Sequence, residues 1–570
     1  MKNTKHLNLG FEQNRYPFIN KFFQKKISKK KNFFLLQKNQ VLLNKINRDV
    51  NFFYPKVINN LKSLLNNINQ VKFTNKQYNY LIGFYVFSLL RNILGRKEKL
   101  KKIFFINKNI FLYSENLKQE KIIFNDCQDL HAAINFNQKK NRLINFSINY
   151  YLIKFFFKKK IFYNRKKKIR FRLNNIKSIK PSIINNLLNL IFNFFSRSTK
   201  VLIFTPFISK FSNFKLQLLF LQFPIFFKME KVFYRYKYNK ILRNTIISKI
   251  NTGNNELDAI LKIMISLLPL CYLEGFEDQK KRAEKLNWNK NPKCIFTSNA
   301  YTYNEIFKMY CAINKVKKII IGQHGTNYCF SKFKFDPAFE QVVYSKFLSW
   351  GYHGKNTIKG FNFIQNNIID TPSKSAKKIL LIFNGFRGEN LYDESFDYHE
   401  YIQYYYDLIK KIPKKVRKNI LVKFHHNQNC FLNEKELFIK ILNKNQILSE
   451  KSVLEESINR ALIPIFTYDN TDFYKCLNIA RPTLLFSHNK MHHLKNGPKK
   501  IFNFLNKSGI YIEGDSVKLI NFITNASYQS ITNYWKSPVL KKNIRFFNDH
   551  LNKQTYYKVF HLYKLIKKNF

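Results

Sequence analysis

Glycine and proline are scarce in this chain, at 15 and 14 of 570 residues, and histidine is equally rare at 12. The seven cysteines form no CxxC pair. An odd number of separated cysteines excludes a disulfide framework and a cysteine zinc site, and it favours a reducing compartment. The sequence therefore predicts a cytoplasmic protein without structural disulfides.

Long apolar runs are missing as well. The most apolar runs, at residues 217–228 and 259–273, are shorter than the ~18 residues that span a bilayer. The first residues lack the apolar core of a signal peptide. We therefore expect a protein that is soluble or peripheral on the inner face of the membrane.

Acidic residues are few, since 34 Asp and Glu stand against 100 Lys and Arg and give a net charge of +66. Such a balance indicates nucleic acid or an anionic membrane surface as a partner. The alternative is that the codon bias of an AT-rich genome produces a lysine-rich, solvated surface. The spread of the lysines along the whole chain favours this alternative. In both cases the field favours anionic partners, including nucleotide-activated donors.

The chain divides into four parts by its charge and its hydrophobic periodicity. A basic, weakly periodic start is followed by broad apolar stripes that are typical of helices around residues 55–100. From residue 200, short apolar runs alternate with helical stretches, with an interruption near Trp350. We predict a basic N-terminal extension at 1–50, an N-terminal domain with a helical start at 51–350, a C-terminal domain at 351–552 and a C-terminal helix at 553–570.

The apolar runs after residue 200 are continuous rather than alternating, which is typical of parallel strands buried between helices. The sequence therefore predicts an α/β fold with two parallel-sheet domains wound with helices, at 200–350 and 351–545. The runs are VLIFTPF (201–207), CIFTSN (294–299), KKIIIGQHG (317–325), KKILLIFNGFRG (377–388), ILVKFHHNQN (420–429), ALIPIFTYDN (461–470), TLLF (483–486) and GIYIEGDSVKLINFI (509–523).

Residues 154–177 form a segment dense in Lys, Arg and Phe. Basic residues mixed with aromatic ones are typical of segments that lie on an anionic membrane surface. A solvated connector between helices is the alternative, because the segment shows no clear helical periodicity.

Polar side chains follow several of the predicted strands, where parallel sheets bind their ligands. His324 follows one strand, and His425 and His426 follow another. A histidine at such a place is either a structural turn residue or a general base, whose pKa must lie near the working pH. We favour His324 as the base, because the glycines around it let the backbone turn and expose the imidazole.

A phosphate site is predicted before the helix that begins near Asp472. Asn470 or Thr471 can cap this helix, and its exposed N–H groups and dipole attract anions. Arg387, on a loop flanked by glycines, can hold a second phosphate oxygen. Helix capping without any ligand is the alternative for Asn470 and Thr471.

Several site types are absent from the sequence. His425 and His426 are adjacent rather than spaced for metal binding, and no paired aspartates in a D-x-D spacing occur. The chain has no GxxxxGK[ST] loop, no GxGxxG and no GxSxG. We therefore expect no metal ion and no cofactor.

Two parts of the sequence carry distinctive motifs: IIIGQHGTNYCFSK with FEQVVYSKFLSWGY, and YDNTDFYKCLNIARPTLLF. They resemble the motifs of a transferase family of surface carbohydrate (lipopolysaccharide-type) biosynthesis. IIIGQHGTNYCFSK with FEQVVYSKFLSWGY resembles the family's Q-H-G-G-x-Y-G signature and the Glu and S-D-x-x-L-T-W-G-W that follow it. YDNTDFYKCLNIARPTLLF resembles its T-x-F-L-E-x-L-x-x-x-x-P-T segment. Weaker likenesses extend the resemblance over residues 70–550. The matching residues include Gln323, His324, Gly325, Tyr328, Glu340, Trp350, Gly351, Thr471, Phe473, Leu477, Pro482 and Thr483.

The resemblance implies a GT-B-like fold, with two Rossmann-like domains facing a cleft, and a metal-independent transferase with a nucleotide-activated donor. A looser similarity reaches the teichoic-acid glycerophosphotransferases, whose R/K-x-H strand end corresponds to Lys423 and His425. His324 would then be the base, and the donor diphosphate would be held by Lys423, His425 and Thr471. The cleft would include Gln323, Gly325, Tyr328 and Glu340. Tyr328 and Trp350 either shape this cleft or pack in the interior, and packing is the interpretation that we favour for both.

Four residues depart from the family pattern. Thr326 and Cys329 replace glycines, Ser345 replaces an aspartate and Lys475 replaces a glutamate. The first two changes alter the turn, and the last alters donor or acceptor choice or reduces activity.

We predict a transferase that moves a glycosyl or related phosphate-linked unit from a nucleotide-activated donor to a growing surface glycan or a lipid-linked acceptor. An anionic membrane surface is a further expected partner, and nucleic acid is not. The alternatives are a basic nucleic-acid-binding protein, which would need its charge on one face, and a transferase remnant with reduced activity.

Overall fold

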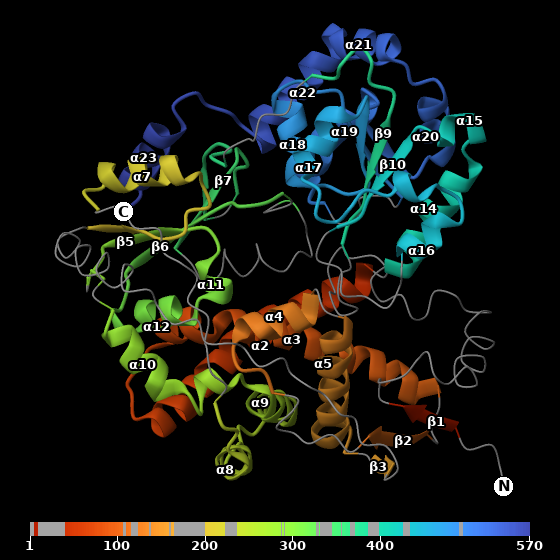
Figure 1. Cartoon of the computed structure of the whole chain (residues 1–570). Helices are drawn as coiled ribbons and strands as arrows, with labels where there is room; N and C mark the ends of the chain where they lie inside the picture. Colours follow the sequence, from red (N-terminus) through yellow and green to blue (C-terminus); the bar gives the residue numbers. More distant parts are fainter. Residues whose placement is uncertain are drawn as a thin grey trace.

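The structure is a computed structural model in which two parallel-sheet domains lie over a helical N-terminal region (Figure 1). It describes residues 5–8, 40–106, 110–115, 123–135, 138–158, 161–164, 200–222, 236–286, 288–289, 291–326, 330, 345–354, 356–364, 371–385, 398–425, 434–488 and 494–570.

Two long helices dominate the N-terminal region. Tyr54 on the first donates a hydrogen bond to Asn79 Oδ1 on the second (2.9 Å). The first helix begins at Gln40, within the predicted extension, and its Leu43 and Ile46 are buried. The helices of this region are α2 (Gln40–Asn69), α3 (Asn75–Ile106), α4 (Cys127–Asn135), α5 (Gln138–Tyr151) and the π-helix η4 (Leu152–Phe157).

A small parallel sheet accompanies these helices and was not predicted. Its strands are β1 (Lys5–Asn8), β2 (Ile110–Glu115) and β3 (Ile161–Asn164). The basic segment 154–177 contributes to η4 and β3, but its residues 159–160 and 165–177 lie outside the described residues. Its predicted binding to anionic lipid stays a prediction.

The first large sheet is parallel and, in the described part of the chain, has the strand order β4-β5-β6-β7-β8. The central strands β5 and β6 are buried, as their continuous apolar runs predicted. The strands are β4 (Val201–Ile203), β5 (Cys294–Thr297), β6 (Lys318–Gly322), β7 (Lys346–Ser349) and β8 (Thr357–Lys359). The helices of this part are α7 (Lys210–Leu219), α8 (Lys240–Ser248), α9 (Asn255–Leu267), η5 (Leu270–Tyr272), α10 (Phe276–Glu284), α11 (Ala300–Tyr303) and α12 (Glu305–Ile313).

This sheet continues beyond residue 350, where we placed the domain boundary. β8 pairs with β7 through Phe347 and Thr357. The strand is three residues long, lies at the sheet edge and is not fully buried, so it has no apolar run.

The second large sheet is also parallel, with the described order β10-β9-β11-β12-β13. Its strands are β9 (Ile379–Ile382), β10 (Ile420–Lys423), β11 (Ile463–Phe466), β12 (Leu484–Ser487) and β13 (Tyr511–Glu513). Its helices are α14 (Tyr398–Lys411), α15 (Lys414–Arg417), α16 (Glu434–Ile439), η6 (Lys444–Gln446), α17 (Leu454–Arg460), α18 (Thr471–Asn478), α19 (Asn496–Lys507), α20 (Ser516–Thr524), α21 (Tyr528–Lys536) and α22 (Pro538–Leu551). The two parallel sheets confirm the predicted α/β class.

After α22 the chain returns to the first domain. Lys553 N donates to the carbonyl of Trp350 (2.8 Å), and Asn362 N donates to the carbonyl of Lys553 (2.7 Å). The last helix, α23 (Lys558–Lys568), lies beside α7 (Figure 1). Among the described helices, none is long and apolar enough to cross a membrane.

A buried charge cluster joins α4 to the first sheet domain. Lys308 Nζ donates to Glu305 Oε1 and to the hydroxyl of Tyr272, both at 2.8 Å. The backbone N–H of Cys127 donates to the same carboxylate (3.1 Å). Asp126, which is also buried, accepts a hydrogen bond from the N–H of Asp129 (2.8 Å). The cluster thus places the carboxylates of Asp126, Asp129 and Glu305 close to the ammonium group of Lys308. Asp126 and Glu305 are buried.

This cluster makes stability depend on pH. Burial, then the carboxylates of Asp129 and Glu305, raise the pKa of Asp126 to about 7. The unfolded chain loses this proton near pH 4, so the Asp126 contribution to stability falls as the pH rises from about 4 to about 7. We expect Asp126→Asn to match the wild type near pH 4 and to exceed it at pH 8 by on the order of 1–4 kcal/mol.

Denaturant unfolding at both pH values measures this difference. Asp515→Asn is the matched control, because Asp515 is an exposed carboxylate that caps α20. It is expected to change stability by less than about 0.5 kcal/mol at either pH. Equal pH dependence of wild type and Asp126→Asn would contradict the prediction.

Candidate functional site

The turn after β6 is held by Gln323. Its Nε2 donates to the carbonyl of Gly325 (2.8 Å), and its Oε1 accepts from the N–H of Trp350 (2.8 Å). Trp350 Nε1 donates back to the carbonyl of Gln323 (3.0 Å). Both side chains are fully buried. Gln323 therefore positions the turn and does not line a cleft as we predicted, whereas packing is the correct interpretation of Trp350.

Gly322, at the end of β6, is required by packing. A Cβ atom there would lie 2.8 Å from the ring of Phe363 and 2.9 Å from the ring of Phe296. The glycine thus lets the strand end close against two aromatic side chains. A glycine is needed here because of this close approach, since the backbone of Gly322 is not in the left-handed region.

His324 comes next and is partly buried. Its ring contacts the ring of Phe207 edge-on, with centroids 5.9 Å apart. Phe207 follows β4, has a φ of 59° and is 51% exposed. Phe207 was predicted only as the last residue of an apolar run, because the search for site residues at strand ends considered polar side chains alone.

The turn also crosses to the second domain. Thr326 Oγ1 donates to the carbonyl of Asp469 (3.2 Å), in the loop between β11 and α18. The carbonyl of Phe330 accepts from the N–H of Lys495, the N-cap residue of α19 (2.7 Å). A glycine, which the resemblance predicts at position 326, could not make this bond, so Thr326 adds a contact between the two domains. The segment after β6 thus meets the N-terminal ends of two helices.

Asn470 caps α18. Its Oδ1 accepts a hydrogen bond from the N–H of Phe473 (2.8 Å), and Thr471 is the first helical residue, partly buried. Within the described residues, Nδ2 of Asn470 is buried and has no hydrogen-bond acceptor. A free amide donor beside the first N–H groups of a helix is suited to an anionic oxygen.

Lys475, at the position where the resemblance predicts a glutamate, forms two ion pairs. Its Nζ lies 2.9 Å from Asp472 Oδ1 and 3.1 Å from Glu455 Oε1. Burial acts to lower the pKa of Lys475, but these carboxylates outweigh it and raise the pKa. The charge of Lys475 is therefore compensated locally.

Further polar groups gather at the carboxyl edge of the second sheet. A Cβ atom on Gly385, after β9, would lie 3.0 Å from Cγ of His425, after β10. Thr467, after β11, donates to the carbonyl of Ile382 (2.7 Å) and bonds the hydroxyl of Tyr401. The structure thus brings His425 to the same sheet edge as Asn470 and Thr471.

His488 lies at this edge too and was missed. It follows β12, and its ring contacts those of Tyr401 (5.3 Å), Tyr404 (5.5 Å) and Tyr405 (6.0 Å). The strand TLLF was predicted, but the Ser-His that follows it was not considered. The same signal that found His324 was present.

Lys423 requires a correction. Its ammonium group donates to the carbonyl of Ser449 (2.6 Å) and to the carbonyl and hydroxyl of Ser452 (both 2.7 Å). Three such bonds use all three donors of a lysine. Lys423 therefore holds the loop before α17 and does not bind a donor as predicted.

We expect Lys423→Met to lower the free energy of unfolding by about 1–3 kcal/mol, because the hydrogen bonds of a buried ammonium group are lost. Ligand affinity should stay unchanged. Lys378→Met is the matched control, since this exposed lysine also bonds backbone, at the carbonyl of Lys418 (3.0 Å), and should cost less than about 0.5 kcal/mol. Urea unfolding and nucleotide titration check both variants, and a large loss of nucleotide affinity in folded Lys423→Met would restore the donor role.

Three other predicted site residues lie outside the described residues: Arg387, Tyr328 and Glu340. Cys329 and His426 lie outside them too. In the described ranges no group of three or more His, Cys, Asp or Glu side chains is arranged to hold a metal ion. The expectation of metal-independent chemistry stays a prediction.

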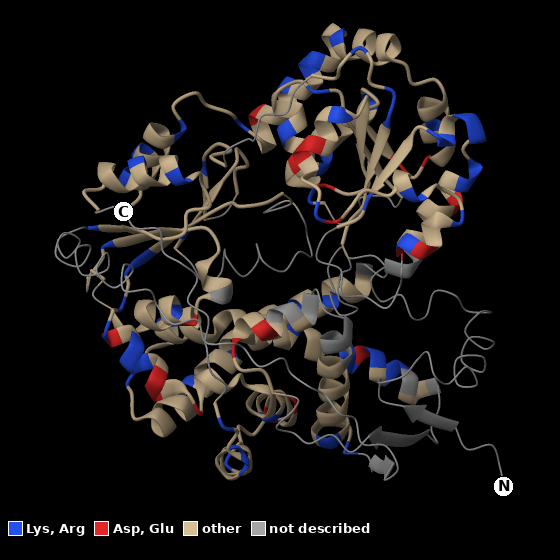
Figure 2. Cartoon of the chain, viewed as in Figure 1, with Lys and Arg blue, Asp and Glu red and all other residues tan. Residues whose placement is uncertain are grey.

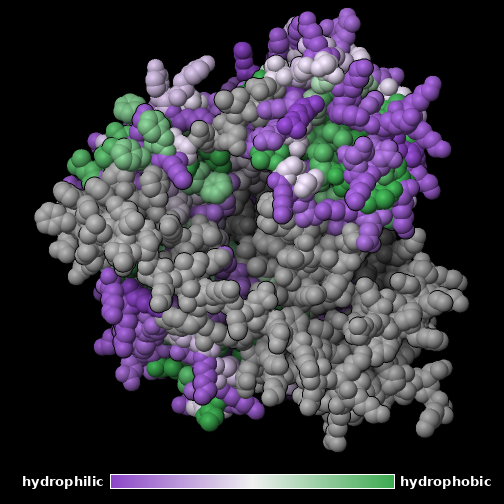
Figure 3. Space-filling view, viewed as in Figure 1, coloured by the Kyte–Doolittle hydropathy of each residue, from purple (hydrophilic) through white to green (hydrophobic). Residues whose placement is uncertain are grey.

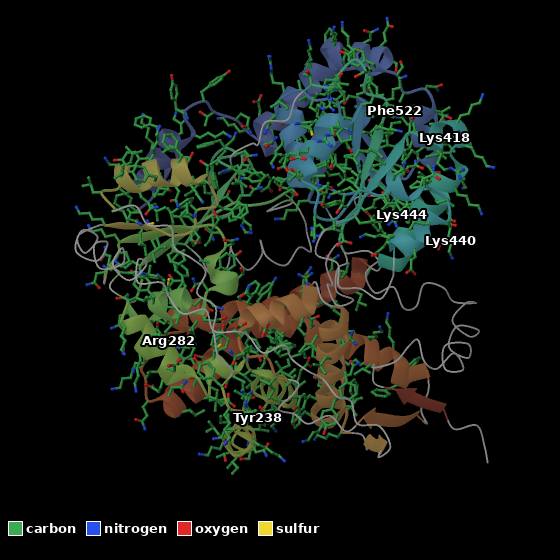
Figure 4. The ribbon with its side chains drawn as sticks, in the orientation of Figure 1. Tyr238, Arg282, Lys418, Lys440, Lys444 and Phe522 are labelled. Atoms are coloured by element: carbon green, nitrogen blue, oxygen red, sulfur yellow. The ribbon has the colours of Figure 1, made fainter. Side chains whose placement is uncertain are left out.

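The positive charge is scattered. Lys and Arg occur on helices of both domains (Figure 2), and Lys418, Lys440 and Lys444 lie on the outer edge of the second domain (Figure 4). A nucleic-acid-binding surface would gather such residues along one groove or stripe.

The chain matches the model of the LIC12162 family transferase over residues 13–556, and it belongs to this family. The protein is therefore a transferase, as the motifs around His324 and Thr471 predicted. No curated protein matches the chain.

Two solved structures show weak similarity. MurG from Acinetobacter baumannii is 9% identical with a TM-score of 0.28, covering 52% of this chain and 79% of its own. A mutant O-GlcNAc transferase from Thermobaculum terrenum is 6% identical with a TM-score of 0.28, covering 54% of this chain and 58% of its own.

Proposed function

We propose that this transferase moves a glycosyl unit, or a related phosphate-linked unit, from a nucleotide-activated donor to a growing surface glycan of the lipopolysaccharide type. One observation carries the proposal: the turn that bears His324 bonds through Thr326 to the loop before α18. The carboxyl edges of the two parallel sheets therefore meet. Because parallel sheets bind ligands at this edge, a donor on one sheet faces an acceptor on the other.

His324 is the general base in this proposal. It takes the proton of the acceptor hydroxyl as that oxygen bonds to the transferred unit. The bond from the unit to the donor diphosphate breaks, and its electron pair leaves with the diphosphate. The reaction needs no metal ion if the protein itself stabilises this leaving charge.

The leaving diphosphate is stabilised by the second sheet edge. The first N–H groups of α18, the amide of Asn470 and the hydroxyl of Thr471 offer donors toward an anion. His425 lies at the same edge, against Gly385. Lys475 does not oppose this role, since its two carboxylate partners already compensate it.

The protein would act in the cytoplasm, peripherally on the inner membrane face, where nucleotide-activated donors and lipid-linked glycans meet. The net charge of +66 favours both anionic partners. The polar groups at the strand ends favour a transferase over a nucleic-acid-binding protein, which binds by charge without them.

Turnover of the full chain with a panel of nucleotide sugars, with and without EDTA, tests the proposal. We expect at least one donor to be consumed in the presence of an acceptor glycan, at the same rate with EDTA. Nucleotide binding without turnover would indicate a remnant. Binding of single- or double-stranded nucleic acid with a steep salt dependence, and no donor use, would support the nucleic-acid alternative.

A further inference from the structure

Helix α7 is apolar on the side that faces solvent. Phe211, Phe214 and Leu218, at i, i+3 and i+7, share one face and are 68%, 41% and 48% exposed. On the other side, Leu216 and Phe220 are buried. A surface helix of a globular protein usually has one apolar stripe and a polar outer face. The outer stripe of α7 is therefore not needed for the fold.

Helix α23 extends this apolar surface. The ring of Phe220, at the end of α7, packs against that of Tyr563 with centroids 4.8 Å apart. Phe560 is exposed on α23, and Leu221 is exposed just after the end of α7. Figure 3 shows hydrophobic residues gathered at the upper left, where Figure 1 places α7 and α23. We call Phe211, Phe214, Leu218, Leu221 and Phe560 the α7–α23 surface. Contiguous exposed apolar side chains mark a docking site.

The charge around this surface has one sign. Lys215 lies over the ring of Phe211 (4.2 Å), and Lys564 lies over the ring of Phe560 (4.4 Å). Residues 200–222 and 553–570 contain no Asp or Glu. The exposed lysines of α7 and α23 are Lys210, Lys215, Lys564, Lys567 and Lys568.

Apolar side chains with a rim of lysines fit the interface of an anionic bilayer, where the rings enter the acyl boundary and the ammonium groups meet headgroups. A second copy of the chain would bring lysine against lysine, with no carboxylate to pair them. The charge therefore favours an anionic membrane over self-association.

The surface reaches the candidate site. The segment 204–209 leads from β4 into α7, and within it Phe207 contacts His324 at 5.9 Å. We propose that the α7–α23 surface docks on an anionic lipid bilayer and holds the His324 turn at the membrane, where a lipid-linked acceptor hydroxyl reaches it. The acceptor part of this inference rests on the proposed function, whereas the docking does not.

Vesicle co-sedimentation of the full chain tests the docking. The probes are phosphatidylcholine vesicles with and without phosphatidylglycerol. We expect the wild type to bind only the anionic vesicles. Two variants should bind these vesicles at least about tenfold more weakly than the wild type does: Phe211→Ser/Phe214→Ser/Leu218→Ser and Lys210→Gln/Lys215→Gln/Lys564→Gln/Lys567→Gln. The control Val517→Ser/Val539→Ser removes exposed apolar side chains from α20 and α22 and should bind as the wild type does.

The outcomes separate docking from catalysis. Thermal unfolding confirms that each variant is folded, and the serine variant should keep wild-type turnover on a water-soluble acceptor while losing turnover on a vesicle-borne one. Unchanged vesicle binding in both variants overturns the docking, even if the protein is an active transferase. The docking is also overturned if analytical sedimentation shows that the wild type is a dimer and the serine variant a monomer, because the surface then serves self-association. If the variants lose vesicle binding but the wild type uses no donor, the docking is supported and the proposed function is contradicted.

Discussion

Replacing His324 by alanine is expected to lower turnover by ~10²–10⁴-fold, which is the usual contribution of a general base. Donor affinity should change little, because the diphosphate lies on the other sheet edge. The loss should appear in kcat and kcat/KM alike, since the interaction is made during proton transfer. Steady-state kinetics and nucleotide titration measure the two quantities separately.

His425→Ala is the matched control for this experiment. It removes the same kind of side chain from the second sheet edge, where it lies against Gly385. We expect it to weaken nucleotide binding and to leave the acid limb of the pH–rate profile in place, whereas His324→Ala should abolish that limb. If folded His324→Ala keeps the wild-type rate and only melts earlier, His324 is a structural turn residue.

Replacing Arg243 by methionine is expected to lower the free energy of unfolding by about 3–5 kcal/mol. Arg243 is 1% exposed, and its Nε and Nη2 donate to the two carboxylate oxygens of Glu274 at 2.7 and 2.6 Å. Its Nη1 donates to the carbonyl of Ile265 (2.8 Å). Removing the guanidinium leaves a buried carboxylate without its counter-charge, which is the costly part of breaking such a pair.

A double variant and a surface pair complete this test. Arg243→Met/Glu274→Leu removes both charges and should recover much of the loss. Arg282→Met breaks a partly exposed pair with Asp278 (3.0 Å) on α10, at the rim of the first domain (Figure 4), and should cost less than about 1 kcal/mol. Equal losses for Arg243→Met and Arg282→Met in denaturant unfolding would contradict the expected cost of burial.

The strands that the sequence predicted best are those with continuous apolar runs. CIFT, KIIIG and ILLI became β5, β6 and β9, because burial on both faces requires such runs. β8, with the residues TIK, had no such signal, since an edge strand need not be fully apolar. The helix that begins at Gln40 was overlooked because its surrounding lysines hid the buried stripe.

The site was predictable where function follows from position at a strand end. His324 and His425 were found in this way, and His488 was missed only because the residues after β12 were not examined. Phe207 gave no such signal, because its side chain is apolar. Lys423 could not be assigned from the sequence, because its partners lie at residues 449–452, which only the fold brings near. The burial of Gln323 against Trp350 is equally a tertiary contact.

The central claim is that a nucleotide-activated donor binds at the carboxyl edge of the second sheet, before α18. Thr471→Glu tests it sharply, since a carboxylate in the first turn suits the helix dipole but repels a phosphate. Val517→Glu adds the same charge to the first turn of α20, where the side chain is exposed. It serves as the matched control.

The deciding measurement is the thermal midpoint with a panel of nucleoside mono- and diphosphates. A nucleotide at 100 times its Kd stabilises the folded chain by about 2.7 kcal/mol. We predict that at least one nucleotide raises the midpoint of the wild type, His324→Ala and Val517→Glu, and that the rise is lost in folded Thr471→Glu. No rise with any nucleotide, or an equal rise in Thr471→Glu, would contradict the donor site.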